Sequence, residues 1–193
     1  SKILHFAQND NTMNSYKIEG VILKRTNFGE AGKLLTIFTR DQGKITVKAV
    51  GVRKTLSKRA GSVELFNHIR AVVIKGRGDL DTLAEVQLVN PFSSWRPHIG
   101  RVTLAYQLAE VVDKQTPDHQ PHPEIFDILV SSLSKLSVLG SDWQLAIGNW
   151  QLAILQELGY LEKGQPFKGD IQKLIEETSQ RPLNSPKLLA KLK

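Results

Sequence analysis

Six basic residues lie close together in the first half of this 193-residue chain. No Asp or Glu occurs between residues 42 and 63, and the basic residues of this stretch are Lys44, Lys48, Arg53, Lys54, Lys58 and Arg59. An uncompensated cationic run is either a solvated loop or a contact surface for a polyanion. Lys44 and Lys48 are an even number of residues apart, so on a strand they share one face. We therefore predict a single contact surface, made by this strand and the loop after it.

Stacking on a planar ligand needs an exposed aromatic ring, and few are available in this half. The candidates are Tyr16, Phe28, Phe38 and Phe66. Phe38 and Phe66 are expected in the core. Phe28 lies beside a glycine in an expected loop, and it is the predicted stacking residue.

The candidate catalytic and metal-binding motifs of this sequence are incomplete or are explained by turns and loops. "GEAGK" at 29–33 lacks the spacing of a phosphate-binding loop and the hydroxyl residue after its lysine. "RGD" at 77–79 is explained by a turn. His119, His122 and Glu124 lie in a Pro-rich stretch without a second ligand cluster, which favours a solvated loop. We expect no catalytic residue, no metal site and no cofactor.

Short alternating runs separated by Gly-containing breaks fill the region between residues 16 and 89, which is typical of β-strands. The predicted strands are 16–25, 33–39, 44–50, 68–75 and 82–89. Gly76 and Gly78 are expected to supply the positive φ angles of a tight hairpin. This pattern predicts a five-stranded OB-fold-like barrel over 13–92, and an SH3-like barrel would give a similar one.

The spacing becomes helical beyond Pro91 and Pro97. The predicted helices are 99–114, 124–139, 143–159, 170–179 and 185–193. Gly159 is expected to end the third of them. The fold class is therefore α+β, with an all-helical domain over 93–193 that packs on itself and on the barrel.

Positive charge is segregated along the chain. Residues 13–92 contain 14 Lys and Arg against 7 Asp and Glu, whereas residues 93–193 contain 11 of each. The whole excess of positive charge therefore belongs to the predicted barrel, which favours polyanion binding over a general solubility effect.

Three expectations concern processing and compartment. Residues 1–12 precede the only methionine, Met13, and are expected to be a vector-derived leader. Because the chain has no cysteine, we expect no disulfides and a reducing cytoplasm as its compartment. No run approaches 18 apolar residues, so no membrane contact is expected.

A set of motifs follows in a fixed order. "G-x-x-L" lies at 20–23, "GEAGKLLTIFT" at 29–39, "GKITVKAVG" at 43–51, a basic Ser-containing loop at 53–59 and "LF" at 65–66. Glu110, Phe126 and "ILQELGY" at 154–160 continue the set. Over about residues 15–161 the chain resembles the RecO family of bacterial DNA repair proteins.

The resemblance implies an OB-fold followed by a helical domain, and a nucleoid-associated protein that binds single- and double-stranded DNA and anneals complementary strands. It implies work with RecR and with the single-strand-binding protein SSB, whose acidic C-terminal tail is a ligand, in loading the RecA recombinase. It also implies DNA contacts at the residues that the charge pattern selects, namely Lys44, Lys48, Arg53, Lys54, Lys58 and Arg59.

The sequence departs from the family pattern after Tyr160. Many members carry a four-cysteine zinc module there, but "LEKGQPFKGDIQ" contains no cysteine, so a structural zinc is not expected. The end at Lys193 falls short of the family's final helices, and we expect the helical domain to be truncated.

Two alternatives stay open beside a non-enzymatic annealing mediator of recombinational repair. An OB-type module that binds RNA, such as a translation or ribosome factor, would use the same phosphate contacts. A protein-interaction scaffold would use its basic barrel to dock an acidic peptide.

Overall fold

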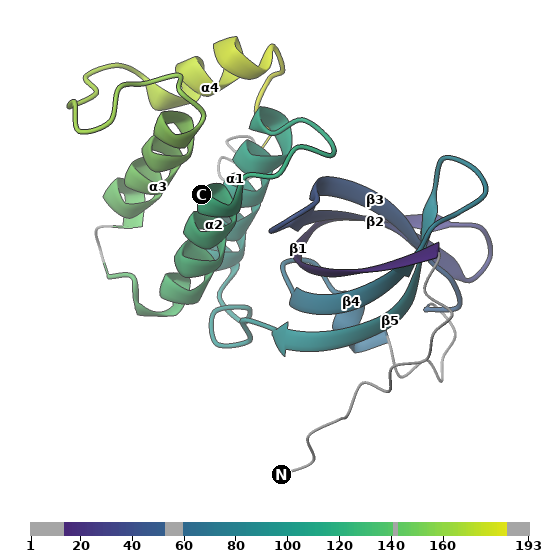
Figure 1. Ribbon diagram of the computed structural model, residues 1–193. Coiled ribbons are helices and arrows are strands. Elements are labelled where there is room, and N and C mark those ends of the chain that lie inside the picture. Colours follow the sequence, from purple (N-terminus) through teal and green to yellow (C-terminus); the bar gives the residue numbers. More distant parts are fainter. Residues whose placement is uncertain (1–13, 53–59, 141–142, 185–193) are drawn as a thin grey trace.

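The computed structural model describes residues 14–52, 60–140 and 143–184, and a β-barrel and a helical domain lie side by side in it (Figure 1). The strands of the barrel are β1 (Ser15–Phe28), β2 (Gly32–Thr39), β3 (Gly43–Ala49), β4 (His68–Ile74) and β5 (Asp81–Asn90). The helices are α1 (Ile99–Gln115), α2 (Pro123–Lys135), α3 (Trp143–Glu157) and α4 (Ile171–Ser179), with short 3-10 helices η2 (Ala60–Val63) and η3 (Leu136–Val138).

The five strands close into a barrel in the order β1-β2-β3-β5-β4, with β4 pairing back onto β1. Closure is achieved by the length of β1, whose residues 15–21 pair with β4 while residues 20–28 pair with β2. The interior is filled by alternate, inward-facing apolar residues such as Ile45 and Val47 of β3. The predicted α+β class, with an OB-fold-like barrel followed by helices, is confirmed.

The seam between β3 and β5 is short, and the helical domain extends it. Only Val47 with Asp81 and Lys48 with Thr82 pair across this seam. Further along the edge of β3, Lys44 forms a parallel bridge with Asp118 of the α1–α2 loop. The loop from the other domain therefore lies against the part of β3 that β5 does not reach.

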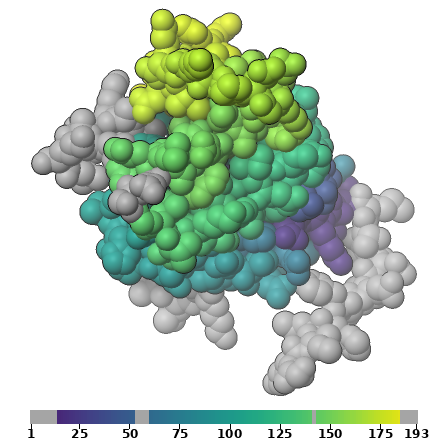
Figure 2. All heavy atoms as spheres, turned by 90° about the vertical axis from the view of Figure 1, so that its left-hand side faces the viewer, coloured from purple at the N-terminus to yellow at the C-terminus, as the bar shows by residue number. Residues whose placement is uncertain are grey.

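The two domains share one hydrophobic core. Val21, Leu23, Phe38 and Phe66 of the barrel belong to the same buried cluster as the inward faces of α1 to α4. The rings of Phe38 and Phe126 lie 6.4 Å apart, from centroid to centroid, across the interface. Figure 2 shows the green and yellow surface of the helical domain lying over the barrel, whose teal and purple surfaces emerge beneath and beside it.

The connection between β5 and α1 is fixed by two consecutive residues. The Trp95 indole donates to the Leu133 carbonyl of α2 over 2.8 Å. The guanidinium of Arg96 donates to the Leu65 carbonyl and to Asn67 Oδ1 on the barrel. Neighbouring side chains of one short segment therefore bind opposite domains, which restrains their relative orientation.

The structure differs from the sequence prediction at two turns. β1 continues to Phe28, three residues past the predicted end at Arg25, so Phe28 is a strand residue that precedes the turn. Gly76 and Gly78 are not among the glycines with positive φ. Gly76 is needed for a different reason, because a Cβ added there would lie 2.2 Å from the Leu80 carbonyl oxygen.

The helices lie close to their predicted positions. Gly159 follows α3 with a φ of 79°, as the predicted helix stop requires. The predicted helix at 185–193 and the predicted leader lie outside the described residues. Within the described residues, the helices are too short or too polar to cross a lipid bilayer.

Gly43→Ala should destabilise the protein far more than Gly29→Ala. Both glycines have positive φ, 68° and 58°, which costs an alanine about 1 kcal/mol at either position. A Cβ at Gly43 would also lie 2.4 Å from the backbone of Gln120, whereas nothing lies within 4 Å at Gly29. The expected loss of unfolding free energy is about 3 kcal/mol for Gly43→Ala. Urea unfolding measures both, and equal losses would contradict the tight interdomain contact.

Candidate nucleic-acid interface

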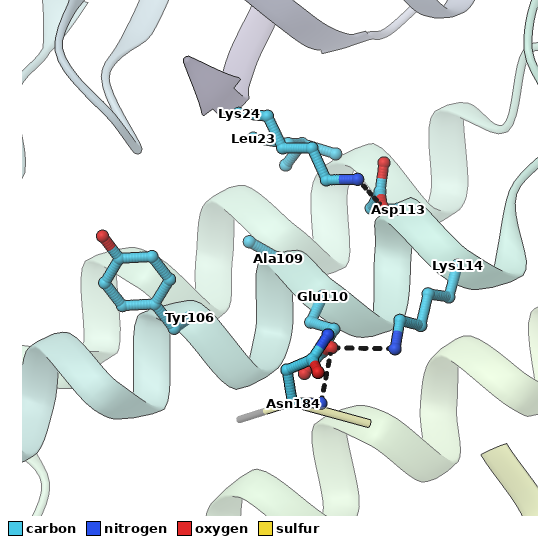
Figure 3. Close-up of a pocket in the computed structure, with 8 residues that line it drawn as sticks. All are labelled: Leu23, Lys24, Tyr106, Ala109, Glu110, Asp113, Lys114 and Asn184. Carbon is cyan, nitrogen blue, oxygen red and sulfur yellow. Dashed lines mark hydrogen bonds and ion pairs between the residues drawn. The ribbon is translucent and has the colours of Figure 1, made fainter. Parts of the chain in front are cut away.

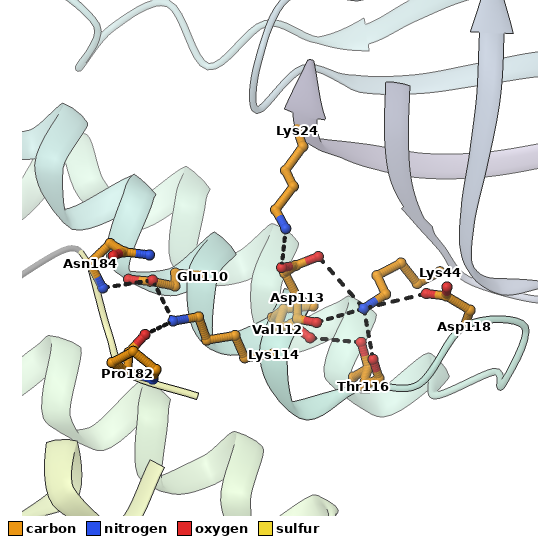
Figure 4. A network of polar contacts seen from close by, with 10 residues as sticks. All are labelled: Lys24, Lys44, Glu110, Val112, Asp113, Lys114, Thr116, Asp118, Pro182 and Asn184. Carbon is orange, nitrogen blue, oxygen red and sulfur yellow. Dashed lines mark hydrogen bonds and ion pairs between the residues drawn. The ribbon is translucent and has the colours of Figure 1, made fainter. Parts of the chain in front are cut away.

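Lys44 and Lys48 lie on the same outer face of β3, as their spacing predicts, but their surroundings differ. Lys44 is 8% exposed. Its ammonium donates to the carbonyl oxygens of Asp113 and Thr116 over 2.6 and 2.9 Å. The Asp113 and Asp118 carboxylates lie 3.6 and 3.4 Å away (Figure 4). Lys44 is thus enclosed by the C-terminal end of α1, where helix carbonyls attract a cation.

The structure corrects the expectation that Lys44 is available to DNA. Its ammonium is surrounded by acceptors of the helical domain, and moving it to a phosphate would leave the carbonyls of Asp113 and Thr116 without this donor and the buried Asp113 carboxylate with one cation fewer. Alternation along the strand gave its face correctly. It could not reveal that another domain covers one end of that face.

Acidic residues of the helical domain neutralise three cations of the barrel. Besides Lys44, Lys24 lies 2.5 Å from the second oxygen of the buried Asp113 carboxylate. Arg40 binds both oxygens of Asp127, over 2.5 and 3.0 Å. This bidentate bond and the charge of Asp127 raise the pKa of Arg40. The barrel surface beside the helices is therefore electrostatically compensated.

The part of the β1–β3 outer face that the helices do not cover carries a different set of side chains. Strand pairing places Thr26, Leu34 and Lys48 side by side, and Thr36 beside Thr46. Phe28 lies two residues beyond Thr26 on the same face and is 41% exposed. We call this the open face; its residues are Thr26, Phe28, Leu34, Thr36, Thr46 and Lys48.

The open face brings together two of the predicted site residues. Phe28 and Lys48 are two strands apart, on the order of 10 Å. A ring for stacking and an ammonium for phosphate at that separation match the two contacts that non-specific single-strand binders use. Strands 2 and 3 of OB-folds are also a common oligonucleotide-binding face. Arg53, Lys54, Lys58 and Arg59 follow β3 in the chain, lie outside the described residues and stay predictions.

Sequence inspection missed two basic residues near the open face. Lys75 and Arg77 are exposed on the β4–β5 loop, residues 75–80, the teal loop at the upper right of Figure 1. The pattern of "GRGD" predicts only a turn. The missed signal was two basic residues at the tip of a hairpin that an OB-fold places beside its binding face.

A pocket of about 220 Å³ lies elsewhere, between β1, α1 and Asn184 (Figure 3). Its two lysines are already bound, Lys24 to Asp113 and Lys114 to Glu110 at 2.8 Å. Neither cation is free for an anionic ligand, so the pocket is a poorer phosphate site than the open face.

Comparison with known families matches both domains. The family model for the recombination protein O N-terminal domain matches residues 13–92, and that for its C-terminal domain matches residues 96–161. The chain belongs to the RecO family. These ranges correspond to the barrel and to the helices from the Trp95–Arg96 connection through α3.

Curated relatives agree with this assignment. The chain is 30% identical to DNA repair protein RecO of Symbiobacterium thermophilum and 32% identical to that of Pelotomaculum thermopropionicum, over 75% and 77% of its own length. It is 30% identical to the Heliobacterium modesticaldum protein of the same name over 91% of its length. The matches span 57%, 57% and 63% of these relatives' own lengths.

Substitution of Lys44 should lower the free energy of unfolding much more than substitution of Lys48, because only Lys44 is enclosed by the other domain. Lys44→Ala removes the buried ammonium and is expected to lower the free energy of unfolding by about 3 kcal/mol. Lys48→Ala removes a half-buried surface lysine and should change it by no more than about 0.5 kcal/mol. Urea unfolding followed by tryptophan fluorescence measures both. A loss at Lys48 as large as that at Lys44 would contradict their different roles.

Proposed function

We propose that this chain is a non-enzymatic DNA-binding protein of recombinational repair that anneals complementary strands. A single strand lies over the open face, with its phosphates near Lys48 and a base stacked on Phe28. The basic residues that follow β3, Arg53, Lys54, Lys58 and Arg59, extend the contact along the backbone.

One observation carries the proposal: the helical domain neutralises the barrel cations beside it and leaves Lys48 uncompensated. Among the described residues, Lys24, Arg40 and Lys44 form ion pairs with that domain. Lys48 forms none there, and it lies on the same face as an exposed aromatic ring, that of Phe28, two strands away. Membership of a family whose curated relatives are named DNA repair proteins supports DNA as the polyanion.

Annealing follows from charge neutralisation rather than from covalent chemistry. Two complementary strands repel each other through their phosphates, and a cationic surface that binds both lowers this repulsion. Contacts to phosphate and to one face of a base carry little sequence information. Base pairing therefore selects the product, and the protein needs no cofactor for it.

The partners are part of the same proposal. Like the family it belongs to, the chain would act with RecR and with the SSB protein, and help to load RecA on SSB-coated strands.

Salt should weaken single-strand binding steeply. About five phosphate contacts predict a slope of log affinity against log salt of about −3.5, so a fourfold rise in salt weakens binding about 100-fold. Fluorescence anisotropy of a labelled oligothymidine measures this slope. Binding that is insensitive to salt would contradict the proposal.

Charge reversal tests the annealing function. Lys48→Glu, and separately the joint reversal of Arg53, Lys54, Lys58 and Arg59 to Glu, should slow annealing of labelled complementary strands at least tenfold. Lys135→Glu is the matched control, since Lys135 is an exposed lysine in the last turn of α2. Equal annealing by all variants would overturn the proposal. A tenfold preference for RNA of equal length would indicate that RNA, and not DNA, is the ligand.

A further inference from the structure

The β4–β5 loop carries two exposed cations, Lys75 and Arg77. The side chains of Lys75 and Arg77 are exposed, and neither forms an ion pair within the described residues. The loop also contains the exposed Asp79, and it leads into Asp81, the first residue of β5. Its cations gather on one half of the loop.

The loop lies beside the open face. Thr82, two residues after the loop, pairs with Lys48 of β3 on one side and with Ile74 of β4 on the other. Lys75 directly follows Ile74. Strands are about 4.8 Å apart, so the start of the loop is on the order of 10 Å from Lys48 across the sheet. A phosphate backbone that crosses Lys48 can therefore continue over this loop.

A carboxylate with two donors fixes the base of the loop. The Tyr16 hydroxyl of β1 donates to Asp81 Oδ2 over 2.6 Å, and the Gly76 amide donates to Asp81 Oδ1 over 2.9 Å. The Lys75 amide also donates to the Asn14 carbonyl over 2.7 Å. Together these contacts join both ends of the loop to β1.

The Asp81 carboxylate is held by these bonds, and it also attracts the nearby Lys75 ammonium of the loop. Burial tends to raise the pKa of Asp81, but the bonds from Tyr16 and Gly76 outweigh it and lower that pKa. Burial, followed by the bond to Asp81, raises the pKa of Tyr16, so its hydroxyl remains a donor. Asp81 thus acts as a fixed acceptor within the fold.

We propose that the β4–β5 loop is a second arm of the nucleic-acid surface, in which Lys75 and Arg77 bind phosphates of the strand that crosses the open face. Tyr16 and Asp81 are positioning residues for this arm. The inference rests on the proposed function, and it adds the place where the strand leaves the barrel.

Positioning matters because a loop fixed before binding loses little conformational entropy when it binds. Arg77 presents a planar fork that matches two phosphate oxygens, which rewards a fixed orientation. Gly76 permits the tight geometry, because a Cβ there would collide with the Leu80 carbonyl oxygen. Gly78 has open space around it.

The phosphate contacts are tested by the salt dependence of oligothymidine binding. Joint replacement of Lys75 and Arg77 by Ala should reduce the steepness of the slope by about 1.4, since each contact to a single strand contributes about 0.7. Lys135→Ala is the matched control for the loss of one charge. Asp79→Asn should instead strengthen binding. An unchanged slope in the double variant overturns the proposal.

Positioning is tested by a double-mutant cycle. Tyr16→Phe removes only the hydroxyl and should weaken binding about threefold in the wild-type background. It should have no further effect once Lys75 and Arg77 are Ala. A purely structural effect would weaken both backgrounds equally and would overturn the role of Tyr16. Gly76→Ala should weaken binding more than Gly78→Ala, and the reverse order counts against the fixed loop.

Failure of this inference is distinguishable from failure of the proposed function. If Lys48→Ala weakens oligothymidine binding while the Lys75 and Arg77 variants match wild type, the open face binds without a second arm, and the inference is overturned. If the unmodified chain fails to bind the oligonucleotide, both are overturned. Thermal unfolding of each variant confirms that the comparisons are made on folded protein.

Discussion

The enclosure of the Lys44 ammonium by the end of α1 is the contact on which the arrangement of the two domains depends. A buried cation is tolerable only when acceptors surround it, and the acceptors here come from the other domain: two carbonyls and the carboxylates of Asp113 and Asp118. Because such a set of partners exists in one orientation only, the ion cluster restrains how the helices sit on the barrel. The apolar core that the two domains share, in which Phe38 packs against Phe126, supplies the buried contact area between them. The ion cluster fixes the orientation of the domains across this area.

This packing also divides the surface of the barrel. Cations near the helices are neutralised by Asp113, Asp118 and Asp127, whereas Lys48, Lys75 and Arg77 form no ion pair with these carboxylates among the described residues. From net charge alone, a polyanion site could be expected anywhere on the surface of the barrel. The helical domain restricts the candidate site to a smaller part of this surface, because it covers the Lys44 end of the β2–β3 face. What remains is a smaller face with one ring, Phe28, and cations on its border.

The two sides of this face differ: on one side the β4–β5 loop carries cations, and on the other β3 enters the domain interface. The β4–β5 loop is tied to β1 through Asp81, a carboxylate whose charge is turned to internal donors. Lys75 and Arg77 therefore lie on a loop whose base is held in place by hydrogen bonds. At the seam of the barrel, β3 pairs with β5 over two residues and then with the α1–α2 loop. The proposed binding surface and the domain interface thus use successive positions along one strand.

The sequence by itself determined the class of fold, because strand alternation, glycine breaks and helical stripes are local signals that follow from backbone geometry. It also determined the segregation of charge and the shared face of Lys44 and Lys48. Only the tertiary structure decided the strand order and the fate of Lys44, since the first depends on pairings such as that of Ser15 with Ile74 and the second on a residue as distant in the chain as Asp113. It also decided that Phe28 ends a strand beside Gly32, and that Thr82, two residues after the β4–β5 loop, pairs with Lys48. Local patterns fix the direction of a side chain, but they carry no information about which distant element covers it.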